Sequence, residues 1–203
     1  MRKFKFFIDY DKEEKWLKKM AKKGYELENI SFGHKFRSIK PENATVKIDY
    51  RIFKKNEDFI EYCVLFEDSG WKHIAGSKKS GVQYFKKNDE NSQEDIFSDT
   101  ISKAGKYKRL SNMFLIPTAT NLALFAIYIT GGQINVNSLI NLKLLYHTPG
   151  LWERTGIAFW GRFLLETPFV VMRGSIWLIP LMMIISFCLV IKTRILYNKQ
   201  KKA

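Results

Sequence analysis

The run MFLIPTATNLALFAIYIT, residues 113–130, contains no acidic or basic side chain. A second charge-free run of the same length, GSIWLIPLMMIISFCLVI, occupies residues 174–191. An α-helix rises about 1.5 Å per residue, so each run would span roughly 27 Å, close to the ~30 Å thickness of the hydrocarbon core of a bilayer. The two runs therefore predict a transmembrane helical hairpin.

The charged residues are concentrated outside these runs. The chain of 203 residues has a formal net charge of +14. Residues 1–110 are long enough for one hydrophobic core. We divide the sequence into a soluble domain at 1–88, a linker and juxtamembrane helix at 89–112, a transmembrane helix at 113–130, an external loop at 131–173, a second transmembrane helix at 174–191 and a basic tail at 192–203.

Basic residues flank the two apolar runs. Lys106, Lys108 and Arg109 precede the first run, and Lys192 and Arg194 follow the second. Lys and Arg are enriched at the cytoplasmic ends of membrane helices, so we expect a multi-pass protein of a bacterial cell membrane with both termini in the cytoplasm. We also expect these five side chains to contact the anionic lipids of the inner leaflet.

The soluble domain contains two similar halves. Each half is expected to form a strand, a helix and two further strands, with the helices over residues 12–23 and 56–69. The dipeptides Gly24-Tyr25 and Gly70-Trp71 are expected just after these helices, and Ile8-Asp9-Tyr10 aligns with Ile48-Asp49-Tyr50. The expected apolar stripes are Trp16, Leu17, Met20 and Ala21 in the first helix and Phe59, Ile60, Cys63 and Val64 in the second.

These elements predict an α+β fold class for the soluble domain. The two helices are expected to lie on one face of a ferredoxin-like antiparallel sheet, and the α-helical transmembrane hairpin follows. Residues 86–98 are polar and acidic and are typical of a linker.

The string EKWLKKMAKKGY, residues 14–25, is followed by Tyr50-Arg51, Glu61-Tyr62 and Gly70-Trp71. This pattern resembles domain-of-unknown-function family 2812, closely over roughly residues 1–90 and only in layout beyond them. The resemblance implies a bacterial protein with an N-terminal domain of this kind and transmembrane helices behind it. It supplies no catalytic residues. Members are often encoded beside PadR-like repressors, which implies envelope-stress or regulatory work by association.

Two polar residues within the apolar runs are candidates for contacts between helices. Buried amide and hydroxyl groups commonly form hydrogen bonds across membrane helices. Asn121 is therefore expected to face Ser186 or a partner subunit.

Residues 151–172 of the external loop are predicted to form an interfacial helix on the outer membrane surface. Trp152 and Trp160 supply apolar side chains, and Arg162 and Glu166 are four residues apart and can pair on one face. The helix is expected to break near Pro168, because proline cannot donate its backbone hydrogen bond.

No catalytic, cofactor or metal site is predicted from the sequence. The glycine-rich phosphate-binding and nucleophile motifs do not occur, and the three histidines lack the spacing of a zinc site. Cys63 and Cys188 are separated by the expected topology, so no disulfide is predicted. The basic excess is attributed to contact with anionic lipid, and no nucleic-acid partner is expected.

Three functions remain open. The first is a membrane-anchored cytoplasmic sensor or adaptor that binds a protein partner or forms a homo-oligomer, in envelope-stress regulation or beside a transporter. The second is a membrane-bound enzyme that uses His73 and Glu61 on a lipid-derived or small anionic substrate. The third is an accessory protein whose hairpin packs against a permease. Convergence of His73 and Glu61 in one pocket would favour the enzyme.

Overall fold

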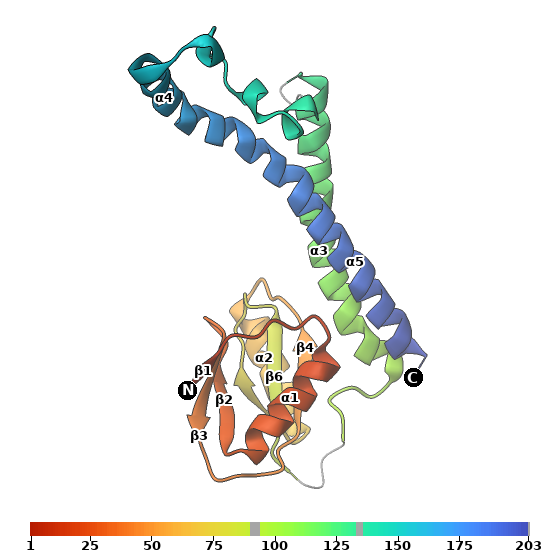
Figure 1. Cartoon of the computed structure of the whole chain (residues 1–203). Coiled ribbons are helices and arrows are strands. Elements are labelled where there is room, and N and C mark those ends of the chain that lie inside the picture. The colour runs from red at the N-terminus through yellow and green to blue at the C-terminus, as the bar shows by residue number, and fades with distance from the viewer. Residues whose placement is uncertain (90–93, 133–135, 203) are drawn as a thin grey trace. The chain divides into compact units, whose positions relative to one another are not determined.

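The computed structural model describes residues 1–89, 94–132 and 136–202 (Figure 1). The chain divides into two compact units. The first unit comprises Met1–Asn112 and Ile191–Ala203, and the second comprises Met113–Val190.

The first unit has an α+β fold with the same order of elements in two halves. The first half contains β1 (Arg2–Lys3), α1 (Tyr10–Lys22), β2 (Tyr25–Asn29) and β3 (His34–Ser38), and the second contains β4 (Val46–Tyr50), α2 (Asn56–Asp68), β5 (Trp71–Ala75) and β6 (Val82–Lys87). Each half forms a small antiparallel three-stranded sheet with its last strand in the centre, in the orders β1-β3-β2 and β4-β6-β5.

The two sheets share an irregularity at equivalent places. The pairing register shifts between Leu27 and Asn29 in β2 and between His73 and Ala75 in β5. Gly24 and Gly70, which have positive φ, precede these strands just after each helix. A β-bulge leaves one residue unpaired and increases the local twist of the strand. The halves therefore agree in strand order and also in the position of the bulge.

The structure corrects the sequence alignment at the start of each half. Asp9 is the N-cap of α1, where its side chain accepts a hydrogen bond from the backbone of Lys12, and Tyr10 begins the helix. Asp49 and Tyr50 instead lie in strand β4. The alignment of Ile8-Asp9-Tyr10 with Ile48-Asp49-Tyr50 is therefore wrong, because the same three letters occur at a helix start and in a strand.

The apolar stripe of α2 is also different from the predicted one. Tyr62 is buried in a cluster with Phe53, Trp71 and Phe85, and Phe59, Cys63 and Phe66 pack against this cluster. Ile60 and Val64 are exposed and lie outside it. The prediction is correct for Phe59 and Cys63 and wrong for Ile60 and Val64. The buried side of the helix includes Tyr62 and Phe66, and Ile60 and Val64 lie on a different side.

The two halves of the unit contact each other. Strand β2 lies against β5, and α1 packs on both β2 and β4. The side chain of Lys86 in β6 pairs with Glu26 in β2 at 2.6 Å. The two sheets are small and separately paired, and the ferredoxin-like arrangement of a single sheet stays a prediction.

Helices dominate the remainder of the chain. The elements are α3 (Thr100–Thr130), α4 (Gly156–Gly174), α5 (Leu178–Lys201) and the 3-10 helices η1 (Val136–Leu139), η2 (Leu142–Leu145), η3 (Leu151–Glu153) and η4 (Ser175–Trp177). Helix α3 and the helical stretch Gly156–Lys201 are long and apolar enough to cross a membrane. The two apolar runs of the sequence thus correspond to two helices of membrane-spanning length.

Pro168 lies inside α4 and does not end it. The hydroxyl of the neighbouring Thr167 donates a hydrogen bond to the carbonyl of Phe163 at 2.7 Å. Hydroxyl side chains and small local adjustments allow proline within apolar helices, because they satisfy backbone groups near the proline. The predicted break near Pro168 is therefore wrong.

Candidate functional site

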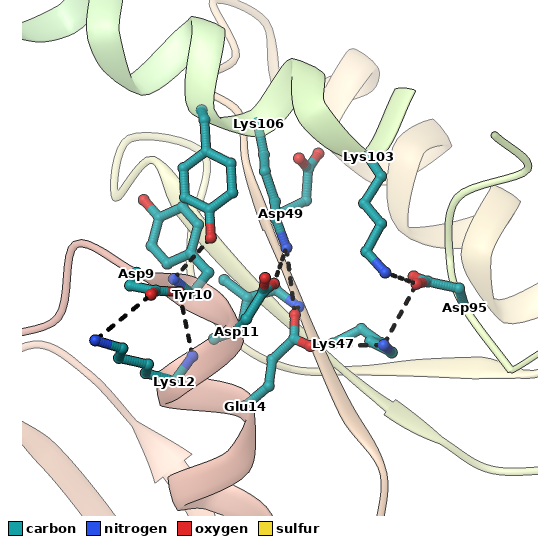
Figure 2. A network of polar contacts seen from close by, with 12 residues as sticks. Asp9, Tyr10, Asp11, Lys12, Glu14, Lys47, Asp49, Asp95, Lys103 and Lys106 are labelled. Carbon is teal, nitrogen blue, oxygen red and sulfur yellow. Dashed lines mark hydrogen bonds and ion pairs between the residues drawn. The ribbon is translucent and has the colours of Figure 1, made fainter. Parts of the chain in front are cut away.

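A network of polar contacts joins the beginning of α3 to α1 and β4 within the first unit (Figure 2). We call it the junction network. Its charged members are Asp11 and Glu14 of α1, Lys47 and Asp49 of β4, Asp95, and Lys103, Lys106 and Arg109 of α3.

Lys106 lies at the centre of the junction network. Its side chain is 0% exposed, and its Nζ lies 3.4 Å from Glu14 Oε1 and 3.6 Å from Asp11 Oδ1. The ammonium also lies 5.5 Å from the centre of the Tyr107 ring and 5.8 Å from that of Tyr10. Removing a charge from water is costly unless it is paired, so the two carboxylates and the aromatic faces explain how this lysine can be buried.

Glu14 connects Lys106 to strand β4. Its carboxylate lies 3.6 Å from Lys47 Nζ and accepts a hydrogen bond from the backbone N–H of Ile48 at 3.1 Å. Burial raises the pKa of Glu14, whereas the charges of Lys106 and Lys47 act to lower it. One side chain of α1 therefore contacts both α3 and β4.

Arg109 provides a second connection between α3 and β4. It donates to the Asp49 carboxylate and to the carbonyl of Tyr50, each at 2.5 Å. The other oxygen of Asp49 accepts a hydrogen bond from the Tyr62 hydroxyl of α2 at 2.8 Å. Burial raises the pKa of Tyr62, and the nearby Asp49 charge raises it further, so this hydroxyl stays a donor. The Asp49 side chain thereby links α3 to α2.

Tyr107 satisfies a backbone group at the start of α1. The N–H of Tyr10, the first residue of that helix, donates to the Tyr107 hydroxyl at 3.0 Å. The first N–H groups of a helix have no partner within the helix. The two rings are stacked, with their centres 5.5 Å apart, and both side chains are buried. The start of α3 thus acts as part of the cap of α1.

Asp95 lies at the edge of the network. Its Oδ2 is 2.7 Å from Lys103 Nζ and 3.3 Å from Lys47 Nζ. Burial alone would raise the pKa of Asp95, but hydrogen bonds and charge interactions with Lys103 and Lys47 hold it below its ordinary value. The ionised form of Asp95 is therefore the one that stabilises this contact.

The junction network corrects one expectation about lipid contact. Lys106 is fully buried between Asp11 and Glu14, so its ammonium cannot reach lipid headgroups in this structure. Arg109 is directed to Asp49. Lys108, Lys192 and Arg194 are exposed, and Arg194 also contacts Ser111 at 3.3 Å. Lipid contact by these exposed residues stays a prediction.

Within the second unit, Ser186 of α5 contacts Thr118 of α3. The Thr118 hydroxyl donates to the Ser186 hydroxyl at 2.9 Å, whereas the Asn121 amide donates to the carbonyl of Pro117 in its own helix at 2.7 Å. Sequence reasoning missed Thr118. Thr118 precedes Asn121 by three residues and so lies on the same side of the helix. This spacing could have identified Thr118 as a candidate for the contact with Ser186. A contact of Asn121 with a partner subunit stays a prediction.

Glu166 pairs with Arg173 and not with Arg162. Its carboxylate accepts hydrogen bonds from the backbone of His147 and from the backbone and hydroxyl of Thr148, and it lies 3.2 Å from Arg173. Spacing along the helix could not reveal these loop donors.

The two predicted interfacial tryptophans occupy different elements. Trp152 is in η3 and packs against Tyr146, and Trp160 is in α4 beside Phe163. Their placement at a membrane interface stays a prediction.

The proposed enzyme pair does not form a site in the described residues. Glu61 lines a groove of about 610 Å³ with Arg51, Asp58 and Tyr62, and His73 is not part of that lining. His73 instead contacts Gln83 at 3.0 Å, and burial lowers its pKa. No group of three His, Cys, Asp or Glu side chains in the described part of the chain could hold a metal ion.

Comparison with known proteins places the junction network within a recognised region. A protein-family model described as "Protein of unknown function (DUF2812)" matches residues 9–119, which is more than half of the chain. No curated protein and no solved structure matches the chain. The matched region includes α1, β4 and the part of α3 that contacts them.

Proposed function

The chain belongs to the DUF2812 family, and we propose that the matched region, which contains the whole junction network, acts as a sensor or adaptor. In this proposal the α+β domain is tethered to the cytoplasmic face of a bacterial membrane and binds a protein partner. Regulation of an envelope-stress response and assistance to a transporter both fit such a role.

The buried Lys106 is the observation that carries this proposal. It lies in the first half of a helix that continues to Thr130 through an apolar stretch long enough to cross a membrane. Its partners Asp11 and Glu14 belong to α1 of the soluble domain. A displacement of the membrane helix and a change in α1 would therefore alter the same ion pairs, which gives the proposed coupling a physical link.

Helix α2 offers a surface for the protein partner. Ile60, Val64 and Leu65 are 53%, 46% and 63% exposed. The helix sequence NEDFIEYCVLFED contains five acidic residues and no basic residue. Exposed apolar side chains beside charges of one sign are typical of interaction sites, and the acidic residues favour a partner with basic side chains over an anionic bilayer.

The charge distribution supports the proposed orientation, with both termini in the cytoplasm. Lys108 and Lys192, at the ends of the two apolar runs, are exposed and suit the cytoplasmic side. We also propose that the two small sheets form one ferredoxin-like layer, since β2 lies against β5.

Site-specific photo-cross-linking in native membranes tests the partner surface. A benzoylphenylalanine at position 65 should give a reproducible protein adduct, because Leu65 is exposed on α2. A second probe at position 79, in the exposed β5–β6 hairpin turn, is the matched control. The adduct at position 65 should be lost when Ile60→Asp is added. The absence of any protein adduct at position 65 in native membranes would overturn the adaptor proposal.

A further inference from the structure

Three phenylalanine side chains are exposed at one edge of the first unit. Phe4, Phe6 and Phe32 are 75%, 79% and 75% exposed. Phenylalanine is normally among the buried residue types, so a group of exposed rings needs a physical explanation.

The segments that carry these rings adjoin each other. Strand β1 pairs with β3, so that Arg2 lies opposite Lys35 and Lys3 opposite His34. The Phe4 ring lies over Gly33, where an added Cβ atom would be only 2.9 Å from Phe4 Cδ1. Phe32 immediately precedes this glycine, and Phe6 follows Phe4 by two residues. The three exposed rings therefore lie on adjoining segments of the chain.

Basic side chains lie in the same segments as the rings, and the ammonium of Lys5 lies 4.9 Å from the centre of the Phe7 ring. Arg2, Lys3 and Lys5 are exposed in the same N-terminal segment, and Lys35 is exposed in β3. Among the residues that the structure describes, the acidic partner of this group is Glu28, which pairs with Lys35 at 3.1 Å. We define the aromatic edge as Phe4, Phe6 and Phe32 together with Arg2, Lys3, Lys5 and Lys35. Its charge is opposite to that of the exposed face of α2.

We propose that the aromatic edge docks on the surface of an anionic bilayer. The rings enter the boundary between headgroups and acyl chains, and the basic side chains bind the lipid phosphates. This inference rests on the proposed tether, which holds the domain close to a membrane. A second aromatic edge is a poorer occupant, because two copies would bring like charges together and β1 is a two-residue edge strand with only basic side chains.

Spin labels on the full-length protein in lipid vesicles test this inference. A background with Cys63→Ala and Cys188→Ala receives one new cysteine, Phe6→Cys, Ile60→Cys or Leu124→Cys. Vesicles contain either phosphatidylcholine alone or phosphatidylcholine with phosphatidylglycerol. The relative accessibility of each label to oxygen and to a water-soluble nickel complex reports whether it lies in lipid or in water.

The label at position 6 should favour oxygen in the vesicles that contain phosphatidylglycerol, and this preference should decrease severalfold with added salt or with Lys3→Glu and Lys5→Glu. The label at position 60 should remain in water, because Ile60 lies on the acidic helix α2. A position-6 label that is aqueous in both vesicles, or that broadens through contact with a second copy, would overturn the inference. The label at position 124 tests the tether independently: a lipid signal there with an aqueous position 6 rejects the docking and leaves the tether intact, whereas an aqueous position 124 rejects the tether.

Discussion

Lys106 and Lys108 are two residues apart in α3 and have opposite surroundings. Lys106 is fully buried between carboxylates of α1, and Lys108 is exposed. A buried ion pair adds little stability compared with a well-packed apolar pair, but removing one partner leaves the other charge buried. The two lysines therefore provide a matched test of the junction network.

Lys106→Met should destabilise the α+β domain by roughly 3 kcal/mol, because Glu14 and Asp11 lose their buried cation while Lys47 still neutralises part of the charge. Lys108→Met should change the stability by less than about 0.5 kcal/mol, as for other exposed sites. Hydrogen exchange of the amides of α1 and β4 in the full-length protein measures both effects. Equal protection in the two variants would contradict the assigned role of Lys106.

The contacts of Asp95 predict that the stability of the junction network depends on pH in the acid range. Its pKa is lower in the folded protein than its ordinary value, so the ionised carboxylate stabilises the fold above the unfolded pKa of about 3.9. This stabilisation should be lost as the pH falls below about 4 and approaches the folded pKa. The first turns of α3 should then exchange their amide hydrogens faster, after correction for the intrinsic rate.

Asp95→Asn is the control for this acid dependence. Its side chain is similar in size and does not titrate, so this part of the pH dependence should disappear while a smaller stability remains at neutral pH. Titration of the Asp95 carboxyl carbon by NMR measures the pKa directly. A value at or above that of an unfolded aspartate would be inconsistent with the contacts to Lys103 and Lys47.

At the residue scale, the sequence could predict the glycines that follow the helices but not the buried charges. Gly24 and Gly70 were recognisable, since a glycine commonly follows a helix end. The basic cluster that contains Lys106 and Arg109 suggested lipid contact, because the sequence gives no sign that Asp11, Glu14 and Asp49 come from other elements to meet it. Only the tertiary fold brings these groups together.

At the element scale, the hydroxyl pair of Thr118 and Ser186 connects α3 to α5 within the second unit. Single hydrogen bonds between membrane helices contribute about 0.6 kcal/mol on average. A double-mutant cycle with Thr118→Val and Ser186→Ala should give a coupling energy of this size. Reversible unfolding in mixed micelles can measure it.

Thr120→Val is the matched control for that cycle. Thr120 has an exposed hydroxyl that donates to the carbonyl of Ile116 in its own helix. It should therefore show no coupling to Ser186→Ala. A coupling energy for Thr120 equal to that for Thr118 would show that the effect comes from the helix itself and not from the contact between helices.

Element types were more predictable than element ends. The order of strand, helix and two strands follows from the apolar periodicity and is present in both halves. The first strand contains only Arg2–Lys3, because Asp9 caps α1 and the residues between them lead into that cap. In α4, Pro168 was expected to break a helix that continues through it.

At the scale of the whole molecule, the proposed topology makes a prediction for intact cells. In a background without Cys63 and Cys188, cysteines at positions 38 and 200 should react with an impermeant maleimide only after the membrane is permeabilised. A cysteine at position 142, at the exposed Leu142 of η2, should react in intact cells. The physical reason is the basic character of the flanks of both apolar runs. Reaction of positions 38 and 200 from opposite sides would exclude the hairpin.

The sequence also indicated the general architecture of the chain. Two charge-free runs predicted two helices of membrane-spanning length, and the structure contains them. The continuous path from α4 through η4 into α5 was not predicted, because Glu166 and Arg173 interrupt the hydropathy of the sequence. Their pairing with each other and with the loop at His147 and Thr148 accounts for charged residues within this helical stretch.

The helical stretch Gly156–Lys201 has one further consequence. Its 46 residues would extend roughly 69 Å, more than twice the ~30 Å thickness of hydrocarbon available to it. If the stretch lay along the bilayer normal, the hydrocarbon core could hold less than half of it. The stretch must therefore be tilted, or part of it must project into water or lie along the membrane surface. If the stretch crosses a membrane as proposed, a thicker or thinner lipid environment would change which of its side chains are immersed.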